Sequence, residues 1–194
     1  MRLFLAFTPS KETTGQLLDL QRRLNHLCPR IKWTPSESLH LTLLFLGAVE
    51  EKLIPQLTEL LQESGQDNPC ASFRLDRLFL IPSLKNPHVL AIAAEEITRP
   101  TLSNLRQMLR EKLEKAGINP APNKPPHLTL GRFPELNETE KQKLKQNLDL
   151  ITETISVILF PIWTNPSFHL IKTTLAPQGA IHTKLNTFPL SARI

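Results

Sequence analysis

Short apolar runs and regularly spaced leucines recur in the same order in both halves of the 194-residue chain. The runs at 3–7 and 90–94 are too short for a helix and predict buried strands. After each run, leucines three or four positions apart predict an amphipathic helix. Pro29 follows the first predicted helix, and Gly117 is expected to end the second. The leucines are Leu17, Leu20, Leu24 and Leu27 in the first half, and Leu102, Leu105, Leu109 and Leu113 in the second.

A proline-rich loop follows each predicted helix and leads into one and the same tetrapeptide. Residues 28–35 form the first loop, and residues 120–126 form the second. The sequence His-Leu-Thr-Leu then occurs at 40–43 and again, letter for letter, at 127–130. On a β-strand the His and the Thr of each copy share one face, and the two leucines share the other. We therefore expect four core leucines: Leu41, Leu43, Leu128 and Leu130.

The repeat extends beyond the tetrapeptide. The two copies lie 127 − 40 = 87 residues apart, and the same offset aligns the two apolar runs. Charged helix patterns follow at 50–64 and 138–148, and Pro55 is expected to delay the start of the first. Strands are then predicted at 72–81 and 155–162.

Two similar lobes about a pseudo-two-fold axis explain such a repeat, because two copies are too few to stack as a solenoid. The axis would bring the two tetrapeptides to face each other across the junction. With 40% apolar residues, the chain is long enough to bury a core as a single domain, residues 1–194. Its 17 prolines gather between the periodic segments and predict stiff loops.

Charge and cysteine content narrow the partners and the compartment. The net charge of +5 suits an anionic partner. No apolar run approaches the roughly 20 residues that span a bilayer, and the run at 3–7 is shorter than the core of a secretory signal. We therefore expect a cytoplasmic monomer that does not contact a membrane. Cys28 and Cys70 form no CxxC pair and are expected to be free thiols.

Two histidines and two threonines at one cleft form a suitable set for metal-free phosphoryl chemistry. Opening a cyclic phosphate needs a base to deprotonate water, an acid to protonate the departing ribose oxygen, and donors for the nonbridging oxygens. His40 and His127 can share the proton transfers, because an imidazole with the ordinary pKa of about 6.5 takes either form near neutrality. Thr42 and Thr129 can donate hydrogen bonds to phosphate oxygens. No metal or other cofactor is required.

Basic residues flank the two tetrapeptides. Lys32 precedes the first, and Lys124 and Arg132 flank the second, where a cation would add to the binding of phosphate. Strict alternation, however, places Arg132 on the leucine face, opposite His127. Arg132 therefore reaches a phosphate only if its strand bends or ends near Gly131, where glycine permits a kink.

These motif blocks resemble the 2H phosphoesterase superfamily, which is defined by two His-x-Thr/Ser-x motifs. Within it, the chain is most similar to the bacterial and archaeal RNA 2′,3′-cyclic phosphodiesterases, also called 2′-5′ RNA ligases. The blocks are WTPSESLHLTLLFLG at 33–47 and PHLTLGR at 126–132, and the segments 2–6, 168–174 and 179–190 add to the likeness, which covers nearly the whole chain. The resemblance implies an α+β fold that is bilobal and duplicated, with two mostly antiparallel sheets around a central cleft and helices outside.

The resemblance also implies an activity: hydrolysis of a 2′,3′-cyclic phosphate at an RNA end to a 2′-phosphate, without metal or nucleotide cofactor. It makes His40 the proton donor and His127 the proton acceptor, although the residues themselves do not assign the two roles, because the copies are chemically alike. Relatives carry a Tyr after a Gly in the closing segment, whereas this chain has no Tyr and His182 sits near that position. The residues expected to bind the phosphate are Thr42, Thr129 and Arg132.

Other functions use the same residues. Small cyclic or 2′-5′-linked nucleotides could be the substrates, and the site could run in reverse to join RNA ends through a 2′-5′ bond. A non-catalytic RNA-end binder and a metallohydrolase are the alternatives of other classes, but two histidines on separate strands leave a zinc site short of its usual three protein ligands. Phe45 is expected in the core, because it lies on the leucine face. His169 is expected to be a hydrogen-bonded or solvent-facing structural residue.

Overall fold

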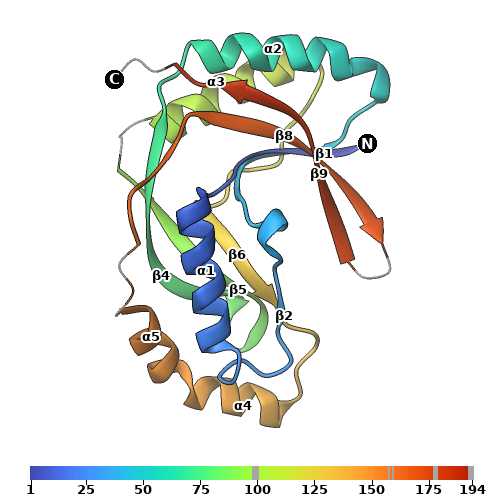
Figure 1. Cartoon of the computed structure of the whole chain (residues 1–194). Coiled ribbons are helices and arrows are strands. Elements are labelled where there is room, and N and C mark those ends of the chain that lie inside the picture. Colours follow the sequence, from blue (N-terminus) through green and yellow to red (C-terminus); the bar gives the residue numbers. More distant parts are fainter. Residues whose placement is uncertain (98–100, 157, 159, 177–178, 192–194) are drawn as a thin grey trace.

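The computed structural model describes residues 1–97, 101–156, 158, 160–176 and 179–191, and its strands form a single antiparallel sheet (Figure 1). The strands are β1 (Arg2–Phe7), β2 (Lys32–Trp33), β3 (Leu41–Ala48), β4 (Ala71–Ser83), β5 (Asn86–Glu96), β6 (His127–Arg132), β7 (Trp163–Asn165), β8 (Ser167–Ala176) and β9 (Gly179–Pro189). Their order is β7-β4-β5-β6-β3-β1-β8-β9, and β2 pairs with β6.

The two halves of this sheet are built alike. One half runs β3-β1-β8-β9 outward from the centre, and the other runs β6-β5-β4-β7. The apolar runs predicted at 3–7 and 90–94 occupy equivalent places, in β1 and β5. Between the halves, β3 and β6 share one residue pair, Leu41 with Leu128. The α+β class with antiparallel sheets and a central cleft is confirmed, and the two expected sheets join through that pair into one.

Caps, proline and glycine mark several of the helix ends. Their bounds are α1 (Lys11–Leu24), α2 (Ile54–Gln66), α3 (Thr101–Lys115), α4 (Glu138–Gln146) and α5 (Leu148–Ser156). The Ser10 hydroxyl accepts from the backbone of Thr13 and caps α1, and Asn137 forms a capping box with Glu140 at α4. Pro55 lies in the first turn of α2, which begins at Ile54, later than the predicted start at 50. Gly117 follows α3 with a φ of +77°, a conformation that favours glycine.

Helices α1 and α3 each pack on the half of the sheet that does not contain the preceding strand. Helix α1 follows β1 but contacts α5, which covers β4. Helix α3 follows β5 but contacts α2 and β3. Figure 1 shows the result: α2 and α3 lie together at one end of the molecule, and α4 and α5 lie at the other. The chain therefore crosses between the two halves repeatedly.

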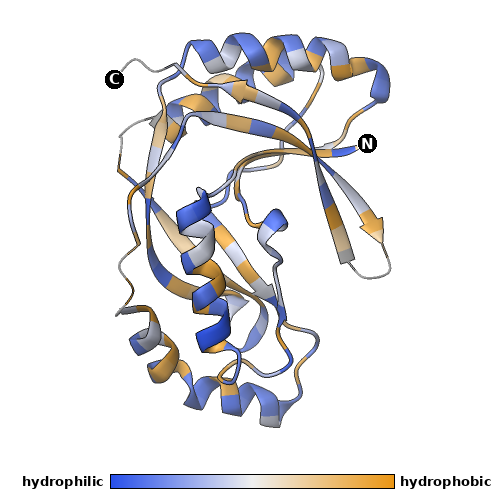
Figure 2. Ribbon diagram, viewed as in Figure 1, coloured by the Kyte–Doolittle hydropathy of each residue, from blue (hydrophilic) through white to orange (hydrophobic). Residues whose placement is uncertain are grey.

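Most of the buried hydrophobic residues form one large core, and Phe4, Ala6 and Ile171 form a small separate cluster. The motif leucines lie in the large core, with Leu41, Leu128 and Leu130 at 0% exposure and Leu43 at 1%, which confirms that expectation. Figure 2 shows α4 as mostly hydrophilic, in keeping with Leu144 as its buried residue. None of the described helices has the length and the apolar content needed to cross a membrane.

The strand predicted at 155–162 is wrong. The segment Leu148–Ser156 forms α5, and the next strand is β7 at Trp163–Asn165, while residues 157 and 159 lie outside the described residues. Ile151 and Ile155 are four residues apart and are both buried, so the apolar spacing here serves one helix face. The helix predicted at 138–148 is also two helices, because α4 ends before Asn147, whose side chain donates to the Leu27 carbonyl at 2.8 Å.

Candidate active site

Both copies of the tetrapeptide line one open cleft of about 800 Å³. His40 lies immediately before β3, and His127 is the first residue of β6. Thr42 and Thr129 follow two residues later and line the same cleft. Antiparallel pairing of Leu41 with Leu128 places the two motifs side by side at the centre of the sheet. Residues 87 positions apart in the sequence thus meet at one surface.

Each histidine ring is held by a backbone carbonyl two residues upstream. The Nδ1 atom of His40 lies 2.7 Å from the Ser38 carbonyl oxygen, and that of His127 lies 2.8 Å from the Pro125 carbonyl oxygen. A carbonyl oxygen only accepts hydrogen bonds, so Nδ1 carries the hydrogen in both rings. In the neutral ring this leaves the Nε2 lone pair free to accept a proton.

A β-bulge turns Arg132 toward the cleft. Opposite β5, Thr129 pairs with Ala91 but Gly131 pairs with Leu90, so Leu130 is an extra residue and the alternation of faces shifts by one. Arg132 therefore lines the same cleft as His127. The bulge at Leu130 is the irregularity near Gly131 that the sequence indicated as the condition for this. A side chain at Gly131 would meet the Lys32 carbonyl oxygen at 3.1 Å and the Ile31 side chain at 2.7 Å, so the close approach of β2 requires glycine.

The first motif has an equivalent bulge, which overturns the expectation for Phe45. Opposite β1, Thr42 pairs with Ala6 but Leu44 pairs with Leu5, so Leu43 is the extra residue. The faces exchange beyond it, and Phe45 lies at the cleft with 41% of its surface exposed. The core position expected for Phe45 is therefore wrong, because strict alternation does not hold across a bulge.

Positive charge surrounds the two motifs. Four cationic residues line the cleft, and no Asp or Glu is among the described residues that do so. The cleft therefore has a positive potential that attracts an anion such as phosphate. Lys124 and Arg132 flank His127, as the sequence indicated, and Lys32 reaches the cleft from β2. The full set is Arg2, Lys32, Lys124 and Arg132.

The surroundings of His40 favour its neutral form. Burial is the main cause, and it lowers the pKa of His40 to about 4. The hydrogen bond to the Ser38 carbonyl raises this pKa, whereas the charges of His182, Arg132 and His127 lower it further. An aromatic ring flanks each histidine as well. The ring centroid of Phe4 lies 4.8 Å from that of His40, and the ring centroid of Phe79 lies 5.8 Å from that of His127.

His182 is a cleft residue whose role the sequence left unassigned. Its ring centroid lies 5.2 Å from that of His40 and 5.2 Å from that of Phe4, and its Nδ1 lies 3.3 Å from the Thr173 hydroxyl. Burial, and then the charge of Arg132, lower its pKa. The one signal in the sequence was the departure from the family's Tyr near this position. The pairing of β8 with β9, opposite Thr173, is what carries His182 to the cleft.

His169 is a buried structural residue, as expected. It is 6% exposed, its Nδ1 lies 3.0 Å from the Thr187 hydroxyl, and its Nε2 lies 3.0 Å from the Thr8 hydroxyl and 3.3 Å from the Lys184 ammonium. Burial, and then the charge of Lys184, lower its pKa to about 4. Its ring is therefore neutral and satisfied in the folded protein.

We expect His169 to make the fold sensitive to acid. Between an ordinary imidazole pKa of 6.5 and about 4, the unfolded chain binds a proton that folded His169 does not, so stability falls as the pH drops through this range. The contribution of His169 is on the order of 3 kcal/mol. Urea unfolding at several pH values tests this, with His169→Gln expected to give a shallower slope of stability against pH. An unchanged slope in the variant would contradict this assignment.

The described side chains do not suggest a metal site. Among them, no three His, Cys, Asp or Glu side chains gather into a group that could hold a metal ion. Cys28 is a buried free thiol, and Cys70 is a half-buried one, as expected. The two motifs contribute two imidazoles and two hydroxyls to the cleft, which His182 and four cationic residues also line.

Comparison with known proteins identifies this arrangement. The sequence model of the LigT-like phosphoesterases matches the chain twice, over residues 7–91 and residues 92–181. The chain belongs to the LigT-like phosphoesterase family. Each of the two matches contains one His-Leu-Thr-Leu copy, which agrees with a duplication. The resemblance seen in the motif blocks is thus confirmed over most of the sequence.

Individual known proteins match this chain along nearly their whole length. The RNA 2′,3′-cyclic phosphodiesterase of Thermotoga maritima is 28% identical over 185 residues, which are 95% of this chain and 93% of the relative. The protein of the same name from Archaeoglobus fulgidus is 28% identical over 188 residues, covering 97% and 99%. The crystal structure of TT0787 from Thermus thermophilus covers 98% of both chains with a TM-score of 0.76 and 26% identity.

Proposed function

We propose that this protein hydrolyses 2′,3′-cyclic phosphates at RNA ends to 2′-phosphates by metal-independent general acid–base catalysis. The observation that carries the proposal is the meeting of two identical His-x-Thr motifs at one cationic cleft. The names of the relatives, RNA 2′,3′-cyclic phosphodiesterase, supply the substrate class. The acting unit is residues 1–194 as one domain, since β8 and β9 complete the half that begins with β1.

In the proposed reaction each histidine moves one proton. His127 accepts a proton from water as the water oxygen bonds to phosphorus, and His40 donates a proton to the ribose O3′ as the bond between O3′ and phosphorus breaks. The 2′-phosphate is the product. Thr42, Thr129 and Arg132 donate hydrogen bonds to the nonbridging oxygens, whose negative charge grows in the transition state.

The lowered pKa of His40 constrains this assignment. With a pKa of about 4, His40 is neutral in the free cleft near neutrality, whereas a donor has to carry a proton. The anionic substrate supplies the remedy, because a phosphate next to the ring raises its pKa and draws the proton in together with the substrate. His40 thus gains, as the substrate binds, the proton that it donates to O3′.

We expect the acid limb of the kcat/KM profile near pH 4. Below that pH His40 is protonated in the free cleft, since burial lowers its pKa to about 4, and its Nε2 can no longer accept a proton. The limb belongs to the pair and has the same position whichever ring is the donor. Initial rates across the acid range measure it, and circular dichroism at each pH shows whether the protein is still folded. A limb at the ordinary imidazole value of about 6.5 would contradict the burial argument.

One assay tests the function itself. A short RNA ending in a 2′,3′-cyclic phosphate is incubated with the protein in EDTA, and the products are resolved as 2′-phosphate or 3′-phosphate. Conversion to the 2′-phosphate in the presence of the chelator supports the proposal. Dependence on added metal points to a metallohydrolase, and tight binding without turnover points to an RNA-end binder; either result overturns it.

The same cleft suits related substrates and the reverse reaction. Small cyclic nucleotides and 2′-5′-linked oligonucleotides present the same phosphorus chemistry. In the joining reaction the oxygen of a 5′-hydroxyl bonds to phosphorus in place of water, and the bond between phosphorus and O3′ breaks; this is the reverse of cleaving a 2′-5′ bond to a cyclic phosphate. Hydrolysis dominates in water when RNA ends are dilute. Monomeric state and cytoplasmic location stay predictions from the sequence.

A further inference from the structure

Two buried polar side chains cross between the halves of the molecule and bind the motif strands at their bulges. Gln21 belongs to α1, yet its amide nitrogen donates to the Leu130 carbonyl in β6 at 2.9 Å and to the Thr34 carbonyl at 2.9 Å. Gln21 is 5% exposed. It thereby ties the loop that leads into the first motif to the strand that carries the second.

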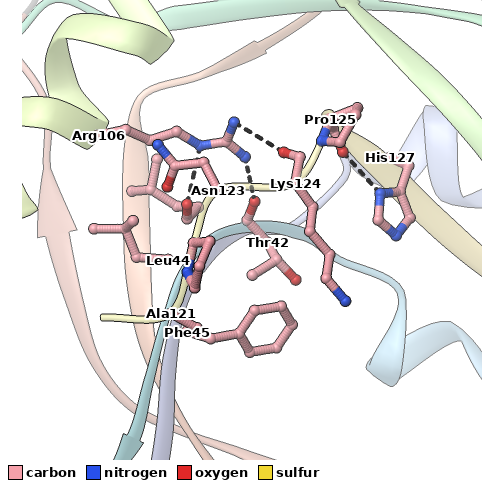
Figure 3. Close-up of a pocket in the computed structure, with 11 residues that line it drawn as sticks. Thr42, Leu44, Phe45, Arg106, Ala121, Asn123, Lys124, Pro125 and His127 are labelled. Carbon is pink, nitrogen blue, oxygen red and sulfur yellow. Dashed lines mark hydrogen bonds between the residues drawn. The ribbon is translucent and has the colours of Figure 1, made fainter. Parts of the chain in front are cut away.

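Arg106 makes the converse connection from α3. Its Nε donates to the Leu43 carbonyl at 3.0 Å, its Nη2 to the Thr42 carbonyl at 2.9 Å, and its Nη1 to the Lys124 carbonyl at 3.2 Å. Figure 3 shows the guanidinium between Thr42 on one side and Lys124 on the other, with His127 and Pro125 beyond. Arg106 thus ties the loop that leads into the second motif to the strand that carries the first.

The acceptors at the two motif strands are equivalent. Leu43 and Leu130 are the fourth residues of the two tetrapeptides and the extra residues of the two bulges. A bulge takes a residue out of the regular pairing with the neighbouring strand, so its carbonyl accepts from other groups, and the Leu130 carbonyl also accepts from the Thr34 backbone N–H at 2.8 Å. In both copies a buried side chain of the crossing helix donates to that carbonyl.

The connections matter for catalysis because they add to a small set of backbone bonds between the two motif segments: β2 pairs with β6, and the Ala121 N–H donates to the Phe45 carbonyl at 2.8 Å. β3 and β6 pair through Leu41 and Leu128. The Lys124 carbonyl bound by Arg106 precedes Pro125, whose carbonyl holds Nδ1 of His127. One guanidinium therefore binds both the strand of Thr42 and the peptide next to the one that orients His127.

We infer that Gln21 and Arg106 are positioning residues that set the two catalytic histidines in register with each other. The inference rests on the proposed function, in which both rings act on one phosphorus. Reacting groups that are misplaced by a fraction of an ångström to one ångström lose rate in the chemical step rather than in binding. The effect of these residues is therefore on kcat.

Arg110 provides a matched control. It lies one turn farther along α3 and donates to the same loop, to the Pro120 carbonyl at 2.7 Å, the Ala121 carbonyl at 2.7 Å and the Asn123 side chain at 3.1 Å. Its hydrogen bonds do not reach the motif strand. Arg106→Met and Arg110→Met each remove a guanidinium and its bonds to one loop, but of the two only Arg106→Met also removes the bonds to the Thr42 and Leu43 carbonyls of the motif strand.

We expect Arg106→Met to lower kcat about 10-fold with little change in KM, and Arg110→Met to stay within about twofold of the parent. Thermal unfolding identifies a temperature at which every variant is folded. Equal loss of kcat in both variants, or none in Arg106→Met, would overturn the inference. If Arg106→Met does not fold, Gln21→Leu, which changes no charge, is measured in its place. Gln21→Leu should also lower kcat about 10-fold, and an unchanged kcat would overturn the inference.

Imidazole nitrogen spectra give a readout that needs no substrate. In two-bond ¹H–¹⁵N correlation spectra, His127 of the parent and of Arg110→Met should show the Nδ1–H tautomer, and His127 of Arg106→Met should show both tautomers. An unchanged tautomer in Arg106→Met would overturn the role of Arg106 through Pro125. This signal does not depend on turnover. If the parent protein is inactive, the proposed function is refuted, and the tautomer of His127 still tests whether Arg106 positions that ring.

Discussion

Replacing either His40 or His127 with alanine is expected to lower kcat on a cyclic-phosphate RNA end by at least about 10²-fold, the scale of removing a general acid or base. Both rings line the cleft, and each is oriented through Nδ1 by a backbone carbonyl. The double variant should lose little beyond the single ones, since the two groups act as one unit.

The measurement is single-turnover hydrolysis, with His26→Ala as the control. His26 is exposed just after α1 and is not among the residues of the cleft. Circular dichroism shows whether each variant retains the fold. Full activity in either motif variant would refute the assignment of the site.

Arg132→Met is expected to reduce kcat by about 10²-fold, the loss found when one donor to a developing oxyanion is removed. It should also move the acid limb of kcat/KM to higher pH. The sign follows from the charge: Arg132 lowers the pKa of His40, so removing its charge raises that pKa, and the last base is protonated at a higher pH.

Arg2→Met separates a local effect of Arg132 from a general loss of positive charge. Arg2 also lines the cleft, but its charge is not among the causes that lower the pKa of His40. The Arg2 variant should bind the RNA more weakly and keep the acid limb in place. An acid limb that stays put in Arg132→Met, or moves to lower pH, would contradict the role of Arg132.

The elements with a regular period were predictable from the sequence, and the site residues beyond a bulge were not. The leucines of α1 and α3 and the apolar runs in β1 and β5 fit their templates over several residues. The face of Phe45 was predicted wrongly, because a bulge at Leu43 depends on how β3 pairs with β1, and no local residue announces it. At the second motif Gly131 indicated a possible kink in the strand, and Arg132 does reach the cleft.

Long-range pairing also hid two other features. His182 reaches the cleft because it lies on the β8–β9 hairpin, and β8 pairs with β1, a strand that is far from it in the sequence. The apolar stretch around Ile155 is equally compatible with a strand and with a helix face, and packing of α5 on β4 decided for the helix. The duplication predicted that the two His-Leu-Thr-Leu motifs meet. The order of the strands in the sheet determined that His182 joins them at the cleft.

The crossing of α1 and α3 makes the two repeats inseparable as fragments. A chain cut between the repeats would leave the first without β8 and β9, and would leave α1 without the strands that bury its leucines. An ancestor made of a single repeat would have met the same problem, and two identical copies exchanging helices would have solved it. Gene fusion would then have turned an obligate homodimer into one polypeptide whose repeats were free to diverge, as Gln21 and Arg106 have done.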